Sequence, residues 1–406
     1  MKNARALEGV KVADFTWVAI GPLATKFLAN MGATVIHIES QTRTDMLRMS
    51  QPYKDFVPGP NRAVMFAVYN DSKYGISLNL KIPQAQKVAK RLVRDWADVV
   101  VDNQRPGVME GWGLDYDSLR KEKPDLIHVA TAFQGKTGPY SVMPAIGNVA
   151  ISLAGYTEIT GWPDREPAIP HGAYTDFVAF PHLITVLIAA LIYRRKTGKG
   201  QYIDLSQLES SLQSIGPVVM DYMINGRIMK RVGNRSTNAA PHAVYRCLGE
   251  DRWCAIAVST DEEWRNFCNV IGNPEWTRDP RFTTLRARKE NEDALNALVE
   301  EWTQQYPPEE LMSRMQAAGV PAGLASASAD LIDDPQMKHR GLLTTLEHPE
   351  IGPHFYQRPP YLMSKTPVEI TMPAPCLGQH NEYVLKQILG MSDDEVAELV
   401  VAGALE

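Results

Sequence analysis

Residues 10–39 read VKVADFTWVAIGPLATKFLANMGATVIHIE. Residues 10–15 and 33–39 are apolar and rich in β-branched side chains, which favours buried strands. Between them, Gly21 and Pro22 form a turn that leads into a helix over residues 23–31. A strand, a helix and a second strand in this order form a βαβ unit, so this stretch predicts the beginning of a parallel sheet.

The same alternation continues for about two hundred residues. Strands are predicted over 76–80, 98–102, 126–130 and 202–206, and helices over 83–95, 177–193 and 207–223. We therefore expect an α/β fold with a Rossmann-like, mostly parallel sheet that is covered by helices on both faces.

The pattern of predicted elements changes near residue 226. From there, short strands and helices follow one another without the βαβ spacing. We expect three parts. Residues 1–225 form a large Rossmann-like domain with a linker, residues 226–328 form a smaller α+β domain, and residues 329–406 form an extended return with a final helix that rejoins the large domain.

Composition bounds the function. The chain has 406 residues, of which 44% are hydrophobic and 22% charged, and its net charge is −5, which indicates a soluble globular protein whose main partner is neither nucleic acid nor a membrane. The four cysteines form no CxxC pair and the nine histidines form no HxH or HExxH motif, which predicts reduced thiols in the cytoplasm and no metal site. No segment has the pattern of a signal peptide or an uncharged membrane span.

The first turn does not have the fingerprint of a dinucleotide site. That fingerprint needs three glycines for close approach of the backbone to a pyrophosphate, whereas this turn reads Ala19-Ile20-Gly21-Pro22. We expect a βαβ unit that binds another ligand, or none.

One carboxylate stands out. Asp176 follows a Pro- and Gly-bearing loop over 169–175 and precedes an apolar helix over 177–192, in which only His182 and Thr185 are strongly polar. We expect this helix to be a core helix buried on nearly all sides, with Asp176 accepting hydrogen bonds from its first-turn N–H groups. A buried, ionised carboxylate is a potential nucleophile, although this segment alone favours an N-cap without chemistry. His171, on the same loop, is a candidate for the same pocket.

Polar residues follow the strand predicted over 98–102. Asn103, Gln104 and Arg105 come directly after it, at the end of a parallel strand where ligands bind in α/β sheets. Arg105 suits a phosphate, and Lys73 supplies a second cation next to a strand. Either could instead be a solvated surface charge.

Several motifs along the whole chain resemble those of the class III CoA-transferases. This family includes formyl-CoA and carnitine CoA-transferases and the related α-methylacyl-CoA racemases. The matching segments are 7–12 with Gly21-Pro22, 32–39, 103–107, 113–116, 137–140, Asp176 with its helix, 198–201, 279–282 and 319–321.

The resemblance implies a ligand, a nucleophile and an assembly. CoA thioesters would be the substrates, with no permanently bound cofactor, and the nucleophilic aspartate falls on Asp176. The implied assembly is a ring-shaped, interlocked dimer, either of identical chains or with a homologous subunit. The implied CoA-contacting positions are Val18, Ala19, Lys73, Asn103, Gln104 and Arg105.

The implied chemistry is a transfer of CoA from an acyl-CoA donor such as succinyl-CoA to a carboxylic acid, through anhydride and thioester intermediates on Asp176. The acceptor we expect is an aryl-substituted succinate, as in a benzylsuccinate-type CoA-transferase, or another catabolic acid. The aromatic side chains expected near it are Phe133, Tyr140, Trp162 and Tyr174.

Two departures from the family pattern bear on alternatives. Racemases of the family carry a Gly-His-Asp group where this chain has Ile146, Gly147 and Asn148, which disfavours an acyl-CoA racemase or epimerase. Formyl-type transferases carry a glycine run where residues 258–264 have none, which argues against oxalate and formate. A non-catalytic CoA-binding subunit of a heteromeric transferase stays open as a further alternative.

Overall fold

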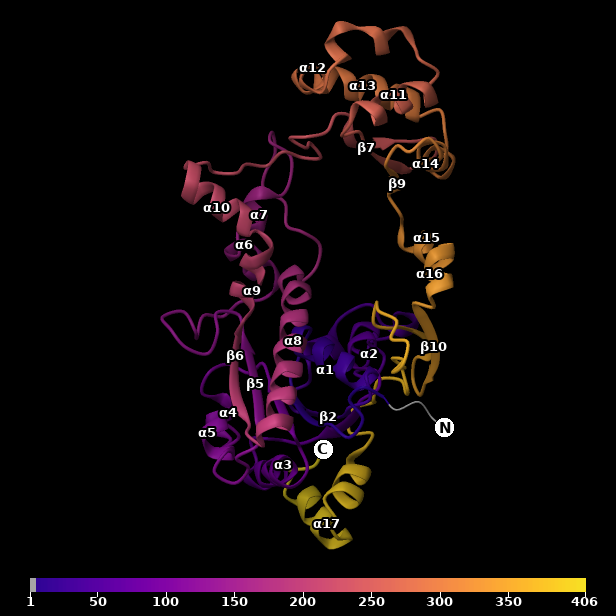
Figure 1. Ribbon diagram of the computed structural model, residues 1–406. Coiled ribbons are helices and arrows are strands. Elements are labelled where there is room, and N and C mark those ends of the chain that lie inside the picture. The colour runs from indigo at the N-terminus through magenta and orange to yellow at the C-terminus, as the bar shows by residue number, and fades with distance from the viewer. Residues whose placement is uncertain (1–4) are drawn as a thin grey trace. The chain divides into compact units, whose positions relative to one another are not determined.

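The chain forms two compact units in a computed structural model that describes residues 5–406 (Figure 1). The first unit comprises the residues up to 156 together with 170–227 and 337–406, and the second comprises 157–169 and 228–336. The second unit starts close to the predicted boundary at 226. It ends eight residues after 328, and it includes 157–169, which the sequence placed in the large domain.

A six-stranded sheet organises the first unit. Its strand order is β3-β2-β1-β4-β5-β6, and all neighbouring strands are parallel, which confirms the predicted Rossmann-like sheet. The strands are β1 Lys11–Phe15, β2 Thr34–Glu39, β3 Tyr74–Ser77, β4 Val99–Asp102, β5 Ile127–Ala132 and β6 Gln201–Ser206.

The strand order creates a crevice between β1 and β4. The chain moves outward from β1 in one direction through β2 and β3, and in the other direction from β4 onward. Phe15 is in register with Asp102, so the loops that leave these two strands start side by side. Ligands of open α/β sheets bind at such a switch point, outside the carboxyl ends of the strands.

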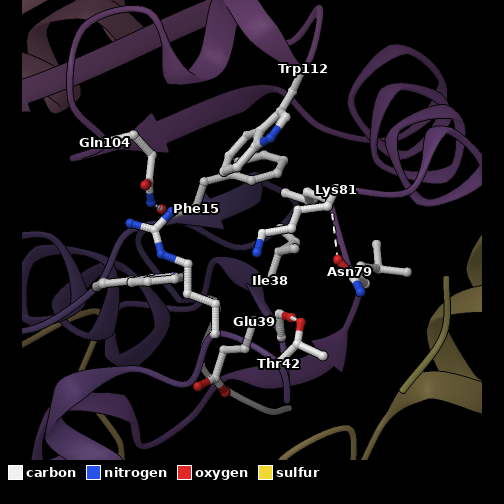
Figure 2. A pocket seen from close by; sticks show the side chains of 13 residues that line it. Phe15, Ile38, Glu39, Thr42, Asn79, Lys81, Gln104 and Trp112 are labelled. Atoms are coloured by element: carbon white, nitrogen blue, oxygen red, sulfur yellow. Dashed lines mark hydrogen bonds between the residues drawn. The ribbon is translucent and has the colours of Figure 1, made fainter. Parts of the chain in front are cut away.

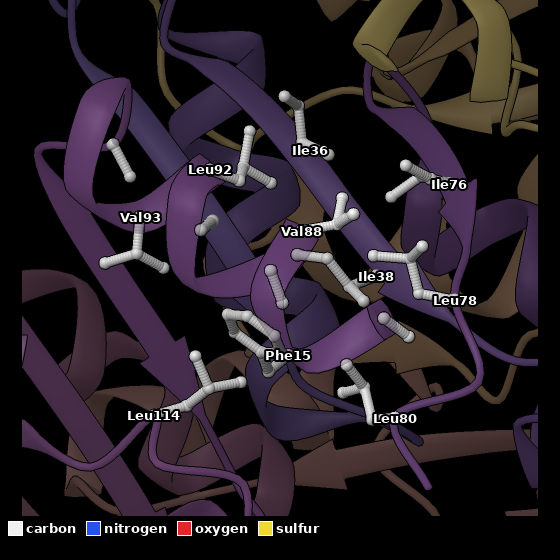
Figure 3. Close-up of a cluster of buried hydrophobic side chains, with 14 of the residues drawn as sticks. Phe15, Ile36, Ile38, Ile76, Leu78, Leu80, Val88, Leu92, Val93 and Leu114 are labelled. Carbon is white, nitrogen blue, oxygen red and sulfur yellow. The ribbon is translucent and has the colours of Figure 1, made fainter. Parts of the chain in front are cut away.

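Alternate residues of the strands supply two separate cores. Ala13 and Val100 belong to a cluster with helix α3 (Pro83–Asp95), the π-helix Tyr383–Ile388 and α17 (Asp393–Val401), which Figure 3 shows around Phe15, Ile36 and Leu92. Val12 and Val99 belong to a cluster with α1 (Ile20–Asn30) and α8 (Tyr174–Thr197). Since successive side chains of a strand point to opposite faces, helices cover both faces of the sheet.

Helix α8 is buried along one edge rather than on nearly all sides, so that prediction is wrong. The buried side chains are Thr175, Ala179, Leu183, Leu187 and Ala190, three or four residues apart. By length and composition α8 could span a membrane, with 28% of its most apolar window buried. In this fold its buried edge packs on α1.

The remaining elements of the first unit are short. The predicted helix over 207–223 is two helices, because the chain turns at Ile215 before Gly216 and Pro217. The short elements of the first unit are the 3-10 helices Met46–Met49 and Lys54–Phe56, α2 Val64–Asn70, α4 Val108–Gly111, α5 Tyr116–Leu119, α6 Gly147–Leu153, α9 Gln207–Ser214, α10 Gly216–Asn225, and the hairpin β10 Leu343–His348 with β11 Gly352–Gln357. Two helices lie at the limits of the units, α7 Tyr156–Ile159 and α16 Pro335–Arg340.

The second unit has its own core around a three-stranded antiparallel sheet, β7-β8-β9. Its elements are β7 His242–Arg246, β8 Trp253–Ala257, α11 Asp261–Val270, the 3-10 helices Glu275–Arg278 and Pro280–Phe282, α12 Leu285–Glu290, α13 Glu292–Thr303, α14 Pro308–Ala317, β9 Ala322–Leu324 and α15 Ser328–Asp333. Thr260 and Glu263 form a capping box at the start of α11, in the segment where the sequence lacks the glycine run. The four cysteines of the chain are free thiols, as predicted.

Lys73 lies beneath the sheet's ligand edge and not on its surface. Its ammonium group donates to Asp14 Oδ2 at 3.1 Å, to the Pro22 carbonyl at 3.0 Å and to Asn70 Oδ1 at 2.8 Å, and its side chain is completely buried. Burial by itself would raise the pKa of Asp14, but Lys73 and His37 outweigh it and lower that pKa. The structure thus corrects the expectation that Lys73 meets a phosphate.

We predict that Lys73→Met destabilises the protein by about 3–5 kcal/mol, because it leaves the Asp14 carboxylate buried without its cation. Urea unfolding at pH 7 measures the change. Lys81→Met is the matched control, since Lys81 is exposed, and its effect should stay below about 0.5 kcal/mol. Equal stability of the two variants would contradict a structural role for Lys73.

Candidate active site

Asp176 is the third residue of α8, and the N-cap of this helix is Ala173. The predicted N-cap role for Asp176 is therefore wrong. Its carboxylate turns to a different helix, where Oδ1 accepts a hydrogen bond from the N–H of Ile20, the first residue of α1, at 3.2 Å. The side chain of Gln207, at the start of α9, also hydrogen-bonds to it.

Burial raises the pKa of Asp176 to about 6, while the hydrogen bonds from Gln207 and Ile20 act in the opposite sense. None of the groups that shift this pKa is a cation. The carboxylate is thus ionised at neutral pH, but it is more basic than an ordinary aspartate. A perturbed carboxylate at a ligand edge is a candidate functional group.

Asp176 opens onto a pocket of about 410 Å³ at the predicted ligand edge. Of the predicted site residues, Val18, Asn103, Gln104, Arg105 and Asp176 line it. Ala19 is 4% exposed and lies in the backbone between two lining residues. Arg105 is the one cation among the described side chains of this pocket. The other lining residues are mostly apolar and include Ile20, Met46, Phe133, Val142, Met143, Ile146 and Ala150.

The loop after β1 is held in an unusual conformation. Val18 has a φ of +66°, which is rare for a β-branched residue and marks strain that the surroundings must maintain. Its N–H donates to Asp45 Oδ2 at 3.0 Å, and Asp45 is fully buried. Strain of this kind concentrates at functional sites, and it places Val18 on the pocket wall.

The loop after β4 is tied to the loop after β1. The Trp17 N–H donates to Asn103 Oδ1 at 2.9 Å, and Asn103 Nδ2 donates to the Trp17 carbonyl at 2.7 Å. Gln104 Nε2 donates to the Phe15 carbonyl at 2.9 Å. These bonds make one rigid ledge from two strand ends that are far apart in the sequence.

A buried ion cluster supports this ledge from the β5 side. Asp102 Oδ1 accepts from the Gln104 N–H at 3.0 Å and from Lys136 Nζ at 2.8 Å, and Asp102 Oδ2 lies 2.8 Å from His128 Nε2. Burial would raise the pKa of Asp102, but His128 and Lys136 lower it overall. Asp102 is thus a paired structural carboxylate, unlike Asp176.

A second hollow lies beyond the ledge. Figure 2 shows the Lys81 amine pointing into the space between Trp112, Phe15 and Ile38. On another wall, the Arg43 guanidinium lies 4.7 Å from the centre of the Trp17 ring. This hollow therefore combines two cations with aromatic surface, a combination that suits a nucleotide.

The second hollow and the Asp176 pocket are parts of one groove. An intermediate depression shares Trp17, Arg43 and Gln104 with the hollow, and it shares Val18, Asn103, Gln104 and Arg105 with the Asp176 pocket. A long ligand can therefore extend from Lys81 past the ledge to Asp176. All lining residues belong to the first unit.

Sequence reasoning missed several residues of this groove. Lys81 follows the strand predicted over 76–80, so the strand-end argument that found Asn103 could also have found Lys81. Arg43, Trp112 and Gln207 carry no comparable local signal, since they are placed by tertiary contacts.

Other predicted neighbours of the pocket are not there. Only Phe133 among the four predicted aromatic residues lines it. Tyr140 is 64% exposed, Tyr174 packs edge-on against Tyr156, and Trp162 belongs to the second unit. His171 is exposed and is not among the residues of the pocket wall.

Comparison with known proteins agrees with the family resemblance over nearly the whole chain. A model of CoA-transferase family III matches residues 7–381. The chain is 31% identical to the succinyl-CoA–D-citramalate CoA-transferase of Chloroflexus aurantiacus, over 97% of both chains. It is 32% identical to the succinate–glutarate CoA-transferase of Agrobacterium fabrum, over 94% of this chain and 95% of that protein.

Solved structures share the fold. A CaiB/BaiF family protein from Brucella suis superposes with a TM-score of 0.87 at 31% identity, over 95% of this chain and all of that one. A protein from Mycobacterium tuberculosis superposes with a TM-score of 0.78 at 26% identity, over 94% of this chain and 99% of that one. This chain therefore belongs to CoA-transferase family III and is a CoA-transferase.

Proposed function

We propose that this enzyme moves CoA from a succinyl-CoA-type donor to a carboxylic acid, with Asp176 as the covalent nucleophile. The observation that carries the proposal is the Asp176 carboxylate, which is ionised at neutral pH, raised in basicity and exposed to the inner end of the groove. The names of the relatives support the donor, since the two enzymes described above are named for succinyl-CoA and for succinate.

The exchange follows four balanced steps. An Asp176 oxygen attacks the thioester carbonyl of the donor, the C–S bond breaks and CoA thiolate leaves, which gives a mixed anhydride. The thiolate then attacks the Asp176 carbonyl carbon and releases the donor as a carboxylate. The acceptor carboxylate attacks the resulting aspartyl-CoA thioester, and the thiolate it releases attacks the acceptor's carbonyl carbon, which frees Asp176. No proton is consumed overall.

The hydrogen bonds to Asp176 have a role in these steps. Oδ1 is held by the Ile20 N–H at the positive end of α1, so we infer that Oδ1 becomes the carbonyl oxygen of the acyl intermediates. When thiolate attacks that carbonyl, negative charge develops on Oδ1. A fixed N–H donor at this position stabilises that charge.

The CoA moiety occupies the groove in this proposal. Lys81 and Arg43 bind its phosphates, and the aromatic surface of Trp17 and Trp112 receives its base. The chain of the thioester passes Val18, the backbone at Ala19, and the side chains of Asn103, Gln104 and Arg105 on its way to Asp176.

The lining of the Asp176 pocket indicates the kind of acid that serves as acceptor. Its lining is mostly apolar, with Arg105 as the one cation among the described side chains there. This chemistry suits an acid with an apolar body and a second carboxylate, and an aryl-substituted succinate has both. The same two relatives are named for D-citramalate and glutarate, which are also dicarboxylic acids.

A racemase is a weaker proposal for the same groove. Proton transfer on both faces of an α-carbon needs a second acid–base group opposite the first. Ile146 and Gly147 line the pocket near Asp176, and Asp176 is the one carboxylate among its described lining residues. A non-catalytic subunit is also less well supported, since it has no use for a basic carboxylate at the end of the groove.

Asp176→Asn and Asp176→Ala should each lower CoA transfer by at least about 10³-fold, because they remove the nucleophile. The assay is transfer from succinyl-CoA to a panel of carboxylic acids by the purified chain. Mass spectrometry after hydroxylamine trapping should find a hydroxamate on the Asp176 peptide of the wild-type protein. Substantial transfer by either variant, or a trapped adduct on another peptide, would refute the covalent role.

The pH dependence follows from the raised pKa of Asp176. Below pH 6 the carboxylate is protonated, so kcat/KM should fall about tenfold for each pH unit. Because burial moves this pKa from 3.8 to about 6 in the folded protein, the wild type should lose stability relative to Asp176→Asn as pH rises from about 4 to about 6. A pH–rate profile and urea unfolding of both proteins check this. A rate that stays flat down to pH 5 would contradict the assignment.

We further propose that α10 packs against a second copy of the chain. No residue of this helix is buried, and Met220, Tyr222, Met223 and Ile224 are at least half exposed. An apolar helix without a cover marks an interface, and the dimer implied by the family resemblance supplies the occupant. A homologous subunit is the alternative partner.

Light scattering of the isolated chain should give a mass of about twice 45.2 kDa. The double variant Met223→Glu with Ile224→Glu should dissociate, because it buries two charges in the interface. Val401→Glu, at an even more exposed apolar residue of α17, is the control and should stay dimeric. A monomeric wild type would argue for a homologous partner subunit.

A further inference from the structure

The side chain of Glu406 binds a turn that lies 366 residues earlier in the chain. Glu406 Oε2 accepts from Ser40 Oγ at 2.8 Å, from the Gln41 N–H at 2.6 Å and from the Thr42 N–H at 3.2 Å. Two consecutive backbone N–H groups and a hydroxyl group thus converge on one oxygen, as in the backbone nests that hold anions.

This turn is a wall of the nucleotide hollow. Ser40, Thr42 and Arg43 line it, and Thr42 is labelled at its rim in Figure 2. Arg43 directly follows the residues that Glu406 holds, and its guanidinium lies over the Trp17 ring. The position of one proposed phosphate-binding cation therefore depends on the turn.

The backbone next to Glu406 is fixed to the other wall. Leu405 forms an isolated bridge with Leu78, the Asn79 N–H donates to the Ala404 carbonyl at 3.0 Å, and the Glu406 N–H donates to the Ser77 carbonyl at 3.4 Å. Leu78, Asn79 and Lys81 line the hollow from this side. Residues 404–406 thus connect the wall that carries Arg43 to the wall that carries Lys81.

The connection depends on an ionised carboxylate. Burial alone would raise the pKa of Glu406, but the donors from Ser40, Thr42 and Gln41 lower it overall. Hydrogen bonds to an ionised acceptor are about twice as strong as neutral ones. A neutral side chain at this position would hold the turn less firmly.

We propose that Glu406 is a positioning residue for the nucleotide end of CoA. It fixes Arg43 relative to Lys81, so that both cations face the same ligand without a further ordering cost on binding. The inference rests on the proposed function, because it takes the hollow to be the site of the CoA nucleotide. Glu406 touches no reacting atom, so it should affect binding of the donor and not the chemistry at Asp176.

The test compares Glu406→Gln and Glu406→Ala with the wild-type enzyme. Calorimetry with CoA and with adenosine 3′,5′-bisphosphate should show Kd values raised about 3-fold in Glu406→Gln and about 10-fold in Glu406→Ala. Binding of pantetheine, which lacks the nucleotide, should be unchanged. In the transfer assay KM for succinyl-CoA should rise by similar factors, while kcat and KM for the acceptor acid stay within about 2-fold.

Two further variants calibrate the result. Glu398→Gln makes the same chemical change at an exposed position of α17 and should leave all constants unchanged. Lys81→Met removes a proposed phosphate contact and should raise the Kd for the bisphosphate at least as much as Glu406→Ala does.

The outcomes separate this inference from the proposed function. Unchanged Kd values in both Glu406 variants, with a raised Kd in Lys81→Met, would overturn the positioning role and leave the proposed function intact. Equal losses of kcat and of pantetheine binding, together with a lowered melting temperature, would assign Glu406 to general stability instead. A wild-type protein that binds neither CoA nor the bisphosphate would overturn the proposed function itself.

Discussion

The paired hydrogen bonds between the Trp17 backbone and the Asn103 side chain, 2.9 and 2.7 Å long, join the loops that leave β1 and β4. Every part of the groove depends on that junction. The loop after β1 continues to Val18 and to the Ile20 N–H that holds Asp176, and the loop after β4 continues to Gln104 and Arg105. Because the two strands are neighbours at the switch point of the sheet, residues more than eighty positions apart form one wall. The strand order of the sheet therefore determines where the groove lies, and the side chains determine only which groups line it.

Three aspartates near this edge, Asp14, Asp102 and Asp176, show how neighbouring groups set the pKa of a carboxylate. Asp14 is paired with Lys73 and His37, and Asp102 with His128 and Lys136, so the pKa of each is lowered and its charge serves to hold neighbouring loops. Asp176 has only neutral donors, and burial raises its pKa to about 6. Of these three, Asp176 is the one without a cation beside it, and it is the one whose pKa is raised. In the proposed function, this raised pKa and the opening onto the pocket suit Asp176 to act as the nucleophile.

Local pattern was enough for the sheet and for much of the groove. The βαβ unit, the helix over 83–95 and the strand ends before Asn103 could be predicted because periodicity and turn residues determine them, and the family resemblance located Asp176. Lys73 and Lys81 show the limit. In the sequence, both are single cations close to β3. Only the structure reveals that Lys73 is buried and paired with Asp14, fifty-nine residues away, whereas Lys81 is exposed. Helix α8 shows the same limit, since its sequence is apolar on all sides while only one edge of the helix is buried.

The two ends of the groove are formed by different kinds of structure, so each end can recognise its part of the substrates independently. The nucleotide hollow is framed by strand ends and by residues 404–406, whose backbone is bonded to the sheet. The acceptor end is closed largely by residues 141–146, a stretch without regular structure before α6. Loops accept substitutions that a sheet edge does not. In the proposed function, the enzyme can therefore keep one way of holding CoA while the apolar wall around Val142, Met143 and Ile146 selects the acid that receives it.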